Sequence, residues 1–182
     1  MIRGIFFVLG TLFLLYFSRQ AIRNPHVHGF YRFFAFELIL SLILLNHPRW
    51  FEDPFSPRQC LSWLLLAASL FFVIHAVFLL KRHGGYAQRE DTPENHAFEN
   101  TVHVVEEGLY RYVRHPMYSS LLFLAWGAFF KHITPINIVL ILLATLLLVA
   151  AAKIEERENI SFFGAAYTDY MRRSRMFIPW VF

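Results

Sequence analysis

Five long runs of apolar residues constrain this chain more than any other feature of its sequence. They cover residues 4–17, 33–47, 61–80, 117–130 and 136–152 of a 182-residue chain that is 57% hydrophobic. A bilayer core about 30 Å thick needs about 20 helical residues to cross it. The third run reaches that length alone, and the others reach it with their flanking residues. The sequence therefore predicts an all-α, polytopic integral membrane protein with about five transmembrane helices.

The positions of Lys and Arg predict how these helices are oriented. If the N-terminus lies outside, thirteen Lys and Arg residues fall on the inner side and four on the outer side, as the positive-inside rule requires. The first run lacks a convincing cleavage site, so we expect it to be retained. We expect one integral membrane domain over residues 1–182, with three spans in residues 1–81 and the cofactor-binding loop, a helical hairpin and the C-terminal segment in residues 82–182.

Composition excludes several other classes of function. Anionic lipid headgroups account for the net charge of +4, so no nucleic-acid partner is predicted. Cys60 is the single cysteine, which rules out a disulfide framework, and the nine histidines are scattered, so we predict no metal site. Membrane lipids and a lipophilic small molecule or lipid substrate are the expected partners. The bacterial inner membrane or the endoplasmic reticulum is the expected location.

The polar residues collect in two regions that this topology puts on the cytoplasmic side, residues 81–116 and 153–179. Pro116 suits the first turn of a helix, which would place Arg114 and His115 beside a helix N-terminus that favours anions. The fourth and fifth runs form a hairpin that returns Glu155 and Glu156 to the same membrane face. The sequence therefore predicts a polar pocket at the inner interface.

Two motifs around this pocket resemble a known family. The stretches "EEGLYRYVRHPMY" and "EERENISFFGAAYTDYMRRSRMFIP" resemble the isoprenylcysteine carboxyl methyltransferases, which are related to the phospholipid methyltransferases. The resemblance covers roughly residues 95–179, while the first three runs match only in layout. It implies an integral membrane methyltransferase that uses S-adenosylmethionine, with its active site facing the cytoplasm.

The resemblance also implies site residues. Glu156 and Arg114 would be catalytic, and the cofactor would contact Glu99, Val102, His103, Val104, Val105, Gly108, Tyr110, His115, Pro116, Met117, Tyr118 and Glu155. Three readings of the function stay open. The first is a methyltransferase for a lipophilic carboxylate, thiol or other small molecule, the second a phospholipid amine N-methyltransferase, and the third a non-enzymatic membrane protein that retains the fold.

Three further ionisable residues are candidates for binding the methyl acceptor. Glu37 and His75 lie within apolar runs, where an ionisable residue is a functional candidate by default. The isoprenylcysteine enzymes place an Arg about one turn before the glutamate pair, where this chain has Ala151, and Lys153 is the nearest cation. A second departure from the family pattern puts Glu158 where a Leu is usual. These departures concern the expected acceptor and not the methyl donor, so the identity of the acceptor stays open.

Overall fold

The computed structural model describes residues 2–85 and 101–179. Over these residues the chain is helical, without a strand, and the one isolated β-bridge joins Val113 to Arg175. The prediction of an all-α fold is therefore confirmed. The elements are α1 (Ile2–Phe17), the 3-10 turn η1 (Ala21–Arg23), α2 (His28–Asn46), η2 (His47–Arg49), α3 (Pro57–His83), η3 (Gly108–Arg111), α4 (Pro116–Lys131), α5 (Pro135–Phe163) and α6 (Ala165–Arg173).

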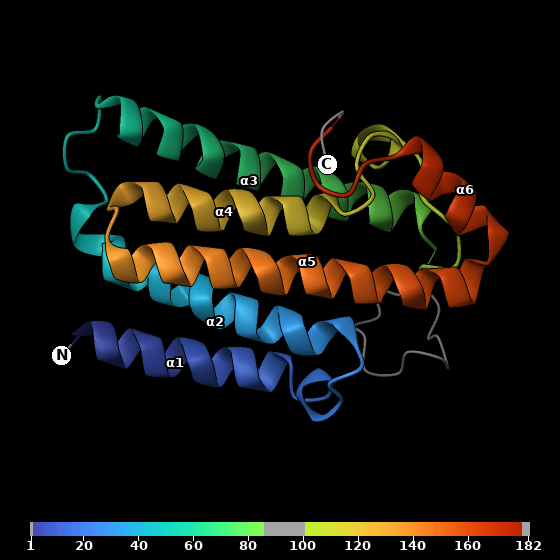
Figure 1. Cartoon of the computed structure of the whole chain (residues 1–182), viewed down its shortest axis with the longest axis horizontal. Coiled ribbons are helices and arrows are strands. Elements are labelled where there is room, and N and C mark those ends of the chain that lie inside the picture. Colours follow the sequence, from blue (N-terminus) through green and yellow to red (C-terminus); the bar gives the residue numbers. More distant parts are fainter. Residues whose placement is uncertain (1, 86–100, 180–182) are drawn as a thin grey trace.

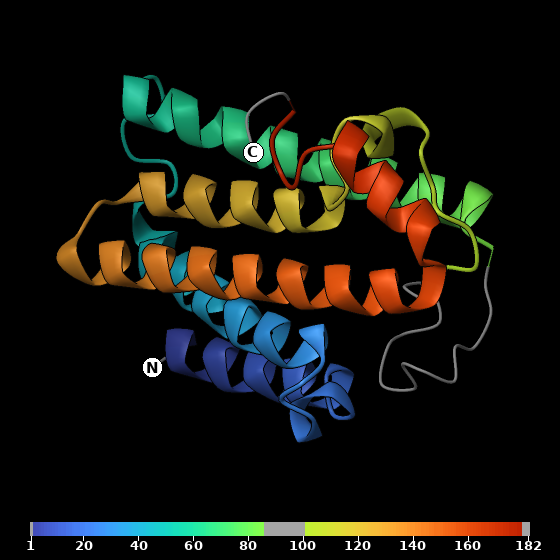
Figure 2. The ribbon, with the colours of Figure 1, turned by 45° about the vertical axis from the view of Figure 1, so that its right-hand side comes forward.

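The five longest helices lie alongside one another, in the spatial order α3, α4, α5, α2 and α1 (Figures 1 and 2). The most extensive contacts join α3 to α4 and α2 to α5, and α1 packs on α2. No residue of α1 is buried. The bundle therefore has one end where α2–α3 and α4–α5 are connected, and an opposite end where α5 passes into α6.

Three helices are long and apolar enough to cross a membrane by length and composition. These segments are His28–Arg49, Pro57–His83 and Pro135–Phe163. The apolar helix α1 has 16 residues, as does α4. The structure thus supports a multi-pass membrane protein, while the count of five spans stays a prediction.

Small residues let α3 and α4 approach closely. A Cβ on Gly127 would lie 2.9 Å from side-chain atoms of Leu66, so this position of α4 has no room for a larger residue. Ser62 of α3 donates a hydrogen bond to the Gly127 carbonyl at 2.7 Å. In a lipid bilayer the hydrophobic effect does not drive helices together. Their association depends instead on close packing through small residues and on hydrogen bonds between helices.

Buried polar side chains join the helices at the end that carries the α4–α5 connection. Lys131, which the sequence places on the outer side, is fully buried. Its Nζ lies 3.0 Å from Gln59 Oε1 and 3.2 Å from the centroid of the Trp63 ring. Asn137 donates to Asn46 Oδ1 at 2.7 Å, and Asn46 donates to the Ala128 carbonyl at 2.8 Å. These groups satisfy one another and fix α2, α3, α4 and α5 at this end.

At the opposite end, α5 continues well past its apolar run, which ends at residue 152, and reaches Phe163. Gly164 then has φ +59°, a conformation that residues with a Cβ rarely adopt, and the chain turns back into α6. Figure 1 shows α6 across the end of the bundle. Beyond α6, the Arg175 amide donates to the Tyr112 carbonyl at 2.9 Å and the Arg114 amide donates to the Arg175 carbonyl at 2.8 Å. The C-terminal segment is thereby attached to the start of α4.

The two ends of the bundle should lie on opposite sides of the membrane. Cys60 is exposed near the start of α3, and Ser161 is exposed near the end of α5. A membrane-impermeant maleimide should label Cys60 on intact cells. It should label the Cys60→Ser, Ser161→Cys variant only after permeabilisation. Labelling of that variant on intact cells would contradict the orientation.

Candidate functional site

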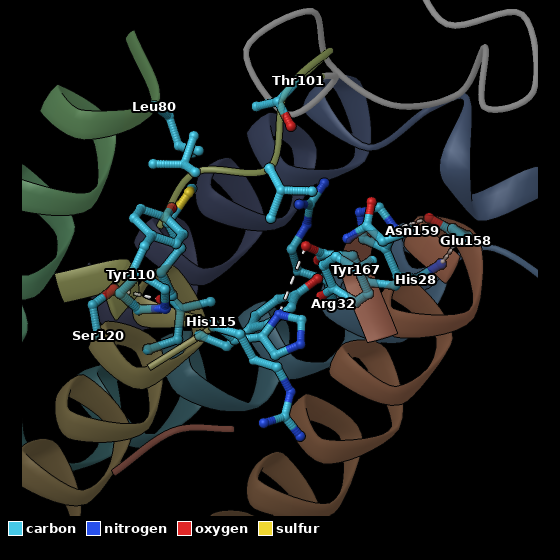
Figure 3. A pocket seen from close by; sticks show the side chains of 18 of the residues that line it. His28, Arg32, Leu80, Thr101, Tyr110, His115, Ser120, Glu158, Asn159 and Tyr167 are labelled. Atoms are coloured by element: carbon cyan, nitrogen blue, oxygen red, sulfur yellow. Dashed lines mark hydrogen bonds and ion pairs between the residues drawn. The ribbon is translucent and has the colours of Figure 1, made fainter. Parts of the chain in front are cut away.

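A pocket of about 280 Å³ lies at the α6 end of the bundle. Its walls come from the start of α2, the start of α4, the last turns of α5, η3 and α6. Figure 3 shows side chains from these segments converging on it. The start of α4 and the last turns of α5 are about 40 residues apart in sequence, and the α4–α5 hairpin brings both to the pocket.

The polar centre of the pocket is His115, whose side chain is 1% exposed. Its Nδ1 lies 3.7 Å from Glu155 Oε1, and its Nε2 lies 3.4 Å from Glu156 Oε1. Arg114 donates from Nε to Glu156 and from Nη1 to the Ser174 carbonyl at 2.9 Å. The convergence of these four residues, predicted from the hairpin, is confirmed.

The backbone around His115 is held from two sides. The His115 amide donates to the Met176 carbonyl at 3.2 Å. The Ser119 hydroxyl donates to the His115 carbonyl at 3.0 Å and is 2.7 Å from the Phe177 carbonyl. Pro116 begins α4, so the imidazole leaves the chain directly before the helix. The C-terminal segment thus fixes the backbone from which the imidazole extends.

Burial and the neighbouring negative charges change the pKa of His115 in opposite directions. Burial lowers the pKa of His115, but hydrogen bonding to Glu155 and Glu156 and their negative charge outweigh it and raise the pKa above its usual value. Burial also raises the pKa of Tyr110 and of Tyr167, and the charge of Glu155 adds to both effects. These phenols therefore remain neutral hydroxyl groups at physiological pH.

The start of α2 and the last turns of α5 form a second polar wall. His28 Nδ1 lies 2.7 Å from Glu158 Oε2, and the His28 amide donates to Glu158 Oε1 at 3.1 Å. Arg32, one turn further along α2, is 8% exposed and also lines the pocket. Figure 3 shows His28, Arg32, Glu158 and Asn159 around this side of the pocket.

Most residues of the implied cofactor set line the pocket. They are Val104, Val105, Tyr110, His115, Pro116, Met117, Tyr118 and Glu155, and the predicted catalytic residue Arg114 joins them. Glu156 is not among the lining residues, since its carboxylate is turned to Arg114 and is 10% exposed, whereas Glu155 is 30% exposed. The two adjacent glutamates thus face different surroundings.

Four members of the cofactor set are not found in the pocket lining. Val102, His103 and Gly108 do not line the pocket, and Glu99 lies outside the described residues. Gly108 has φ +56°, and a Cβ on it would come within 2.7 Å of Leu79 and 2.9 Å of His75. This glycine allows η3 to pack directly on α3.

The three residues predicted to bind the acceptor are also not brought into the pocket. Glu37 accepts a hydrogen bond from Thr11 of α1 at 2.8 Å. The His75 ring stacks on Phe71 at 5.6 Å between centroids. Lys153 is exposed. Their roles stay predictions, and the contacts of Glu37 and His75 are with neighbouring helix and loop residues.

Sequence reasoning missed several residues that line the pocket. His28, Arg32, Glu158, Asn159, Tyr167 and Tyr170 all do so. The i, i+4 spacing of His28 and Arg32 at the start of an apolar helix could have indicated a shared face. Tyr167 and Tyr170 belong to the Y-x-x-Y part of the C-terminal motif, and Tyr170 donates to the Tyr110 carbonyl at 2.6 Å.

The side chains of the pocket suit an organic ligand with both apolar and charged parts. Aromatic and aliphatic residues make up much of the lining, and carboxylates, imidazoles and guanidinium groups stand among them. Within residues 2–85 and 101–179, no group of three or more His, Cys, Asp and Glu side chains is placed to hold a metal ion.

Comparison with known proteins gives a family. The model of the phospholipid methyltransferase family matches residues 57–169. Methanethiol S-methyltransferase 2 of Bradyrhizobium diazoefficiens is 30% identical over 122 residues, which cover 67% of this chain and 44% of that protein. Methanethiol S-methyltransferase of Pseudomonas deceptionensis is 26% identical over 119 residues, which cover 65% of this chain and 42% of that protein.

No solved structure matches the chain significantly. The chain spans less than half the length of these curated relatives. The matched residues 57–169 nevertheless make up more than half of the chain and include η3, α4, α5 and most of the pocket wall. The chain therefore belongs to the phospholipid methyltransferase family, a family of membrane methyltransferases.

Proposed function

We propose that the protein transfers a methyl group from S-adenosylmethionine to a small lipophilic acceptor, with a thiol as the acceptor class. The observation that carries this proposal is the pocket at the start of α4. There Glu155 and His115 face a lining that is largely aromatic and aliphatic. The names of the relatives, methanethiol S-methyltransferases, support the thiol class.

The pocket residues fit the parts of this methyl donor. The donor supplies a methyl group activated by a positive sulfonium. Tyr110, Met117 and Tyr167 offer apolar and aromatic surface for the adenine ring. Glu155 can accept hydrogen bonds from the ribose hydroxyls or from the ammonium group of the donor.

Arg114 and Glu156 support these contacts by fixing His115. Arg114 joins Glu156 to the Ser174 carbonyl, so the start of α4, α5 and the C-terminal segment meet at one point. Two charges removed from water need each other and further hydrogen bonds to be stable, and this cluster supplies both. Their predicted catalytic role would then act through the position of His115, because methyl transfer depends above all on holding two reactants at close range.

A lipophilic acceptor would reach the pocket from the bilayer. An apolar groove of about 430 Å³ lies between α3, α4 and α5, and Phe177 forms part of its lining. The ring of Phe177 is also 6.2 Å from the ring of His115. The groove and the pocket thus lie on either side of Phe177. A thiol must lose its proton to react, and Glu155 is a carboxylate in the pocket that could accept it.

Calorimetry in detergent tests the donor, and labelled-methyl transfer tests the acceptor. S-Adenosylhomocysteine should bind with one site per chain. Label from S-adenosylmethionine should pass to a small alkyl thiol more readily than to the alcohol of the same chain length, which serves as the matched control because a thiolate forms far more readily than an alkoxide.

Absence of any binding would contradict the proposal. Label recovered in phospholipid headgroups would show that the acceptor is an amine and not a thiol. Binding without transfer to thiols, carboxylates or lipids would favour a non-enzymatic protein that retains the fold.

The two adjacent glutamates should respond differently to the same substitution. Glu155→Gln should weaken S-adenosylhomocysteine binding about tenfold or more, the range for a lost charged hydrogen bond, with little change in the melting temperature. Glu156→Gln leaves Arg114 without its charge partner, so it should lower the free energy of unfolding by about 3 kcal/mol. Calorimetry and thermal unfolding in detergent measure the two effects.

Each variant serves as the control for the other, since both remove one negative charge from neighbouring positions of α5. Equal affinity of wild type and Glu155→Gln would rule out Glu155 as a ligand of the donor. A Glu156→Gln protein as stable as wild type would show that the Arg114–Glu156 pair does not hold the pocket together.

A further inference from the structure

The start of α2 brings a cation, Arg32, to the pocket, and the family motifs do not include this residue. His28 and Arg32 are four residues apart and both line the pocket, so they share one face of α2. Figure 3 shows both side chains at the pocket. The matched family region begins at residue 57, so α2 contributes to the pocket from outside it.

The position of α2 against α5 is fixed by the pairing of His28 with Glu158. Both Glu158 oxygens are held, one by the imidazole at 2.7 Å and one by the His28 amide at 3.1 Å. Close packing on the other side of α2 adds to this, because a Cβ on Gly29 would lie 2.6 Å from the Ala21 side chain. The start of α2 is therefore held between η1 and the end of α5.

This position determines where the guanidinium of Arg32 lies. Its Nη2 is 3.8 Å from the point that a Cβ on Gly29 would occupy, so the side chain turns back along α2 toward the helix start. Glu155 lies one turn before Glu158 on α5, and both carboxylates line the same pocket. The pocket thus presents a guanidinium from α2 and a partly exposed carboxylate from α5.

The chemistry of Arg32 suits one kind of ligand group. A guanidinium stays charged at any physiological pH and binds a carboxylate through two parallel hydrogen bonds. With 8% of its surface exposed, this guanidinium is largely shielded from water, and a hydrogen bond to a charged group is stronger in such surroundings than in water. The methyl donor carries a carboxylate and an ammonium group at the end of its amino-acid tail.

We propose that Arg32 binds the carboxylate of the amino-acid tail of S-adenosylmethionine. This inference rests on the proposed function and deepens it, because it assigns the tail to the α2–α5 side of the pocket. The adenosine part then contacts the residues of η3, α4 and α6. Recognition of the donor therefore depends on a residue of α2 as well as on the half of the chain that the family model matches.

Decarboxylated S-adenosylmethionine provides the matched ligand, since it lacks only the carboxylate. Wild type should bind S-adenosylmethionine at least tenfold more tightly than the decarboxylated form. Arg32→Gln should lose about tenfold or more in affinity for S-adenosylmethionine and bind the decarboxylated form as wild type does. The affinity of Arg32→Lys for S-adenosylmethionine should lie between those of wild type and Arg32→Gln, because lysine keeps the positive charge but cannot make the two parallel hydrogen bonds of a guanidinium.

Arg23→Gln removes an exposed cation from the same end of the bundle and should leave both affinities unchanged. Calorimetry and thermal unfolding of each variant in detergent give the readouts. Equal weakening of both ligands in Arg32→Gln would mean that Arg32 only shapes the pocket, and unchanged affinities would mean that it has no part in binding. Either result overturns the inference while leaving the proposed function intact.

If Arg32→Gln does not fold, Arg32→Lys decides alone, and a loss confined to S-adenosylmethionine is the supporting result. Failure of wild type to bind either ligand would instead defeat the proposed function, and the Arg32 inference with it.

Discussion

Charge pairing between the start of α4 and the last turns of α5 holds the pocket in shape. His115 lies between Glu155 and Glu156, and Arg114 joins Glu156 to the carbonyl of Ser174. Each of these groups would be costly to bury alone. Together they connect α4, α5 and the C-terminal segment at the one place where these elements must meet, and the remaining carboxylate, Glu155, is left facing the pocket.

Buried polar groups are paired in different ways at the two ends of the bundle. At the end of the α4–α5 connection, the amides of Asn46 and Asn137 bond to each other and to backbone carbonyls, and Lys131 lies against Gln59 and Trp63. That end is closed. At the pocket end the charged groups surround a hollow, and the elements forming it come from both halves of the chain. A closed end that fixes the helices and an opposite end that contains a pocket are consistent with the proposed methyltransferase.

The apolar runs and the two motifs were sufficient to predict the all-α fold, the start of α4 at Pro116 and the meeting of Arg114 and His115 with Glu155 and Glu156. These features follow from local signals. The signals are the lengths of the apolar runs, the proline that begins α4, and a connection between α4 and α5 so short that the two helices must be antiparallel neighbours. The contribution of α2 did not follow. His28 and Arg32 carry no local sign of their partners, and the pairing of His28 with Glu158 joins residues 130 positions apart. Such a contact depends on which helices pack together, which hydrophobic patterning alone leaves open.

The different surroundings of Glu155 and Glu156 could likewise not be predicted from the sequence alone. Helical geometry indicated that the two side chains point about 100° apart, but only the neighbouring elements decide which one faces the pocket. Likewise the roles expected for Glu37 and His75 came from their depth in apolar runs and stay predictions, while Glu37 accepts a hydrogen bond from Thr11 and the His75 ring stacks on Phe71. An ionisable residue in a membrane helix needs a partner, and that partner can be a neighbouring side chain rather than a ligand.

The location of the donor site is the central claim, and photochemical crosslinking tests it most directly. S-Adenosylmethionine carrying a labelled methyl group, irradiated with ultraviolet light on the purified protein in detergent, should attach to peptides containing Tyr110, Tyr118 or Tyr167, and excess S-adenosylhomocysteine should suppress the labelling. Label concentrated in peptides from the opposite end of the bundle, around Gln59 or Lys131, or labelling that S-adenosylhomocysteine does not suppress, would contradict the account.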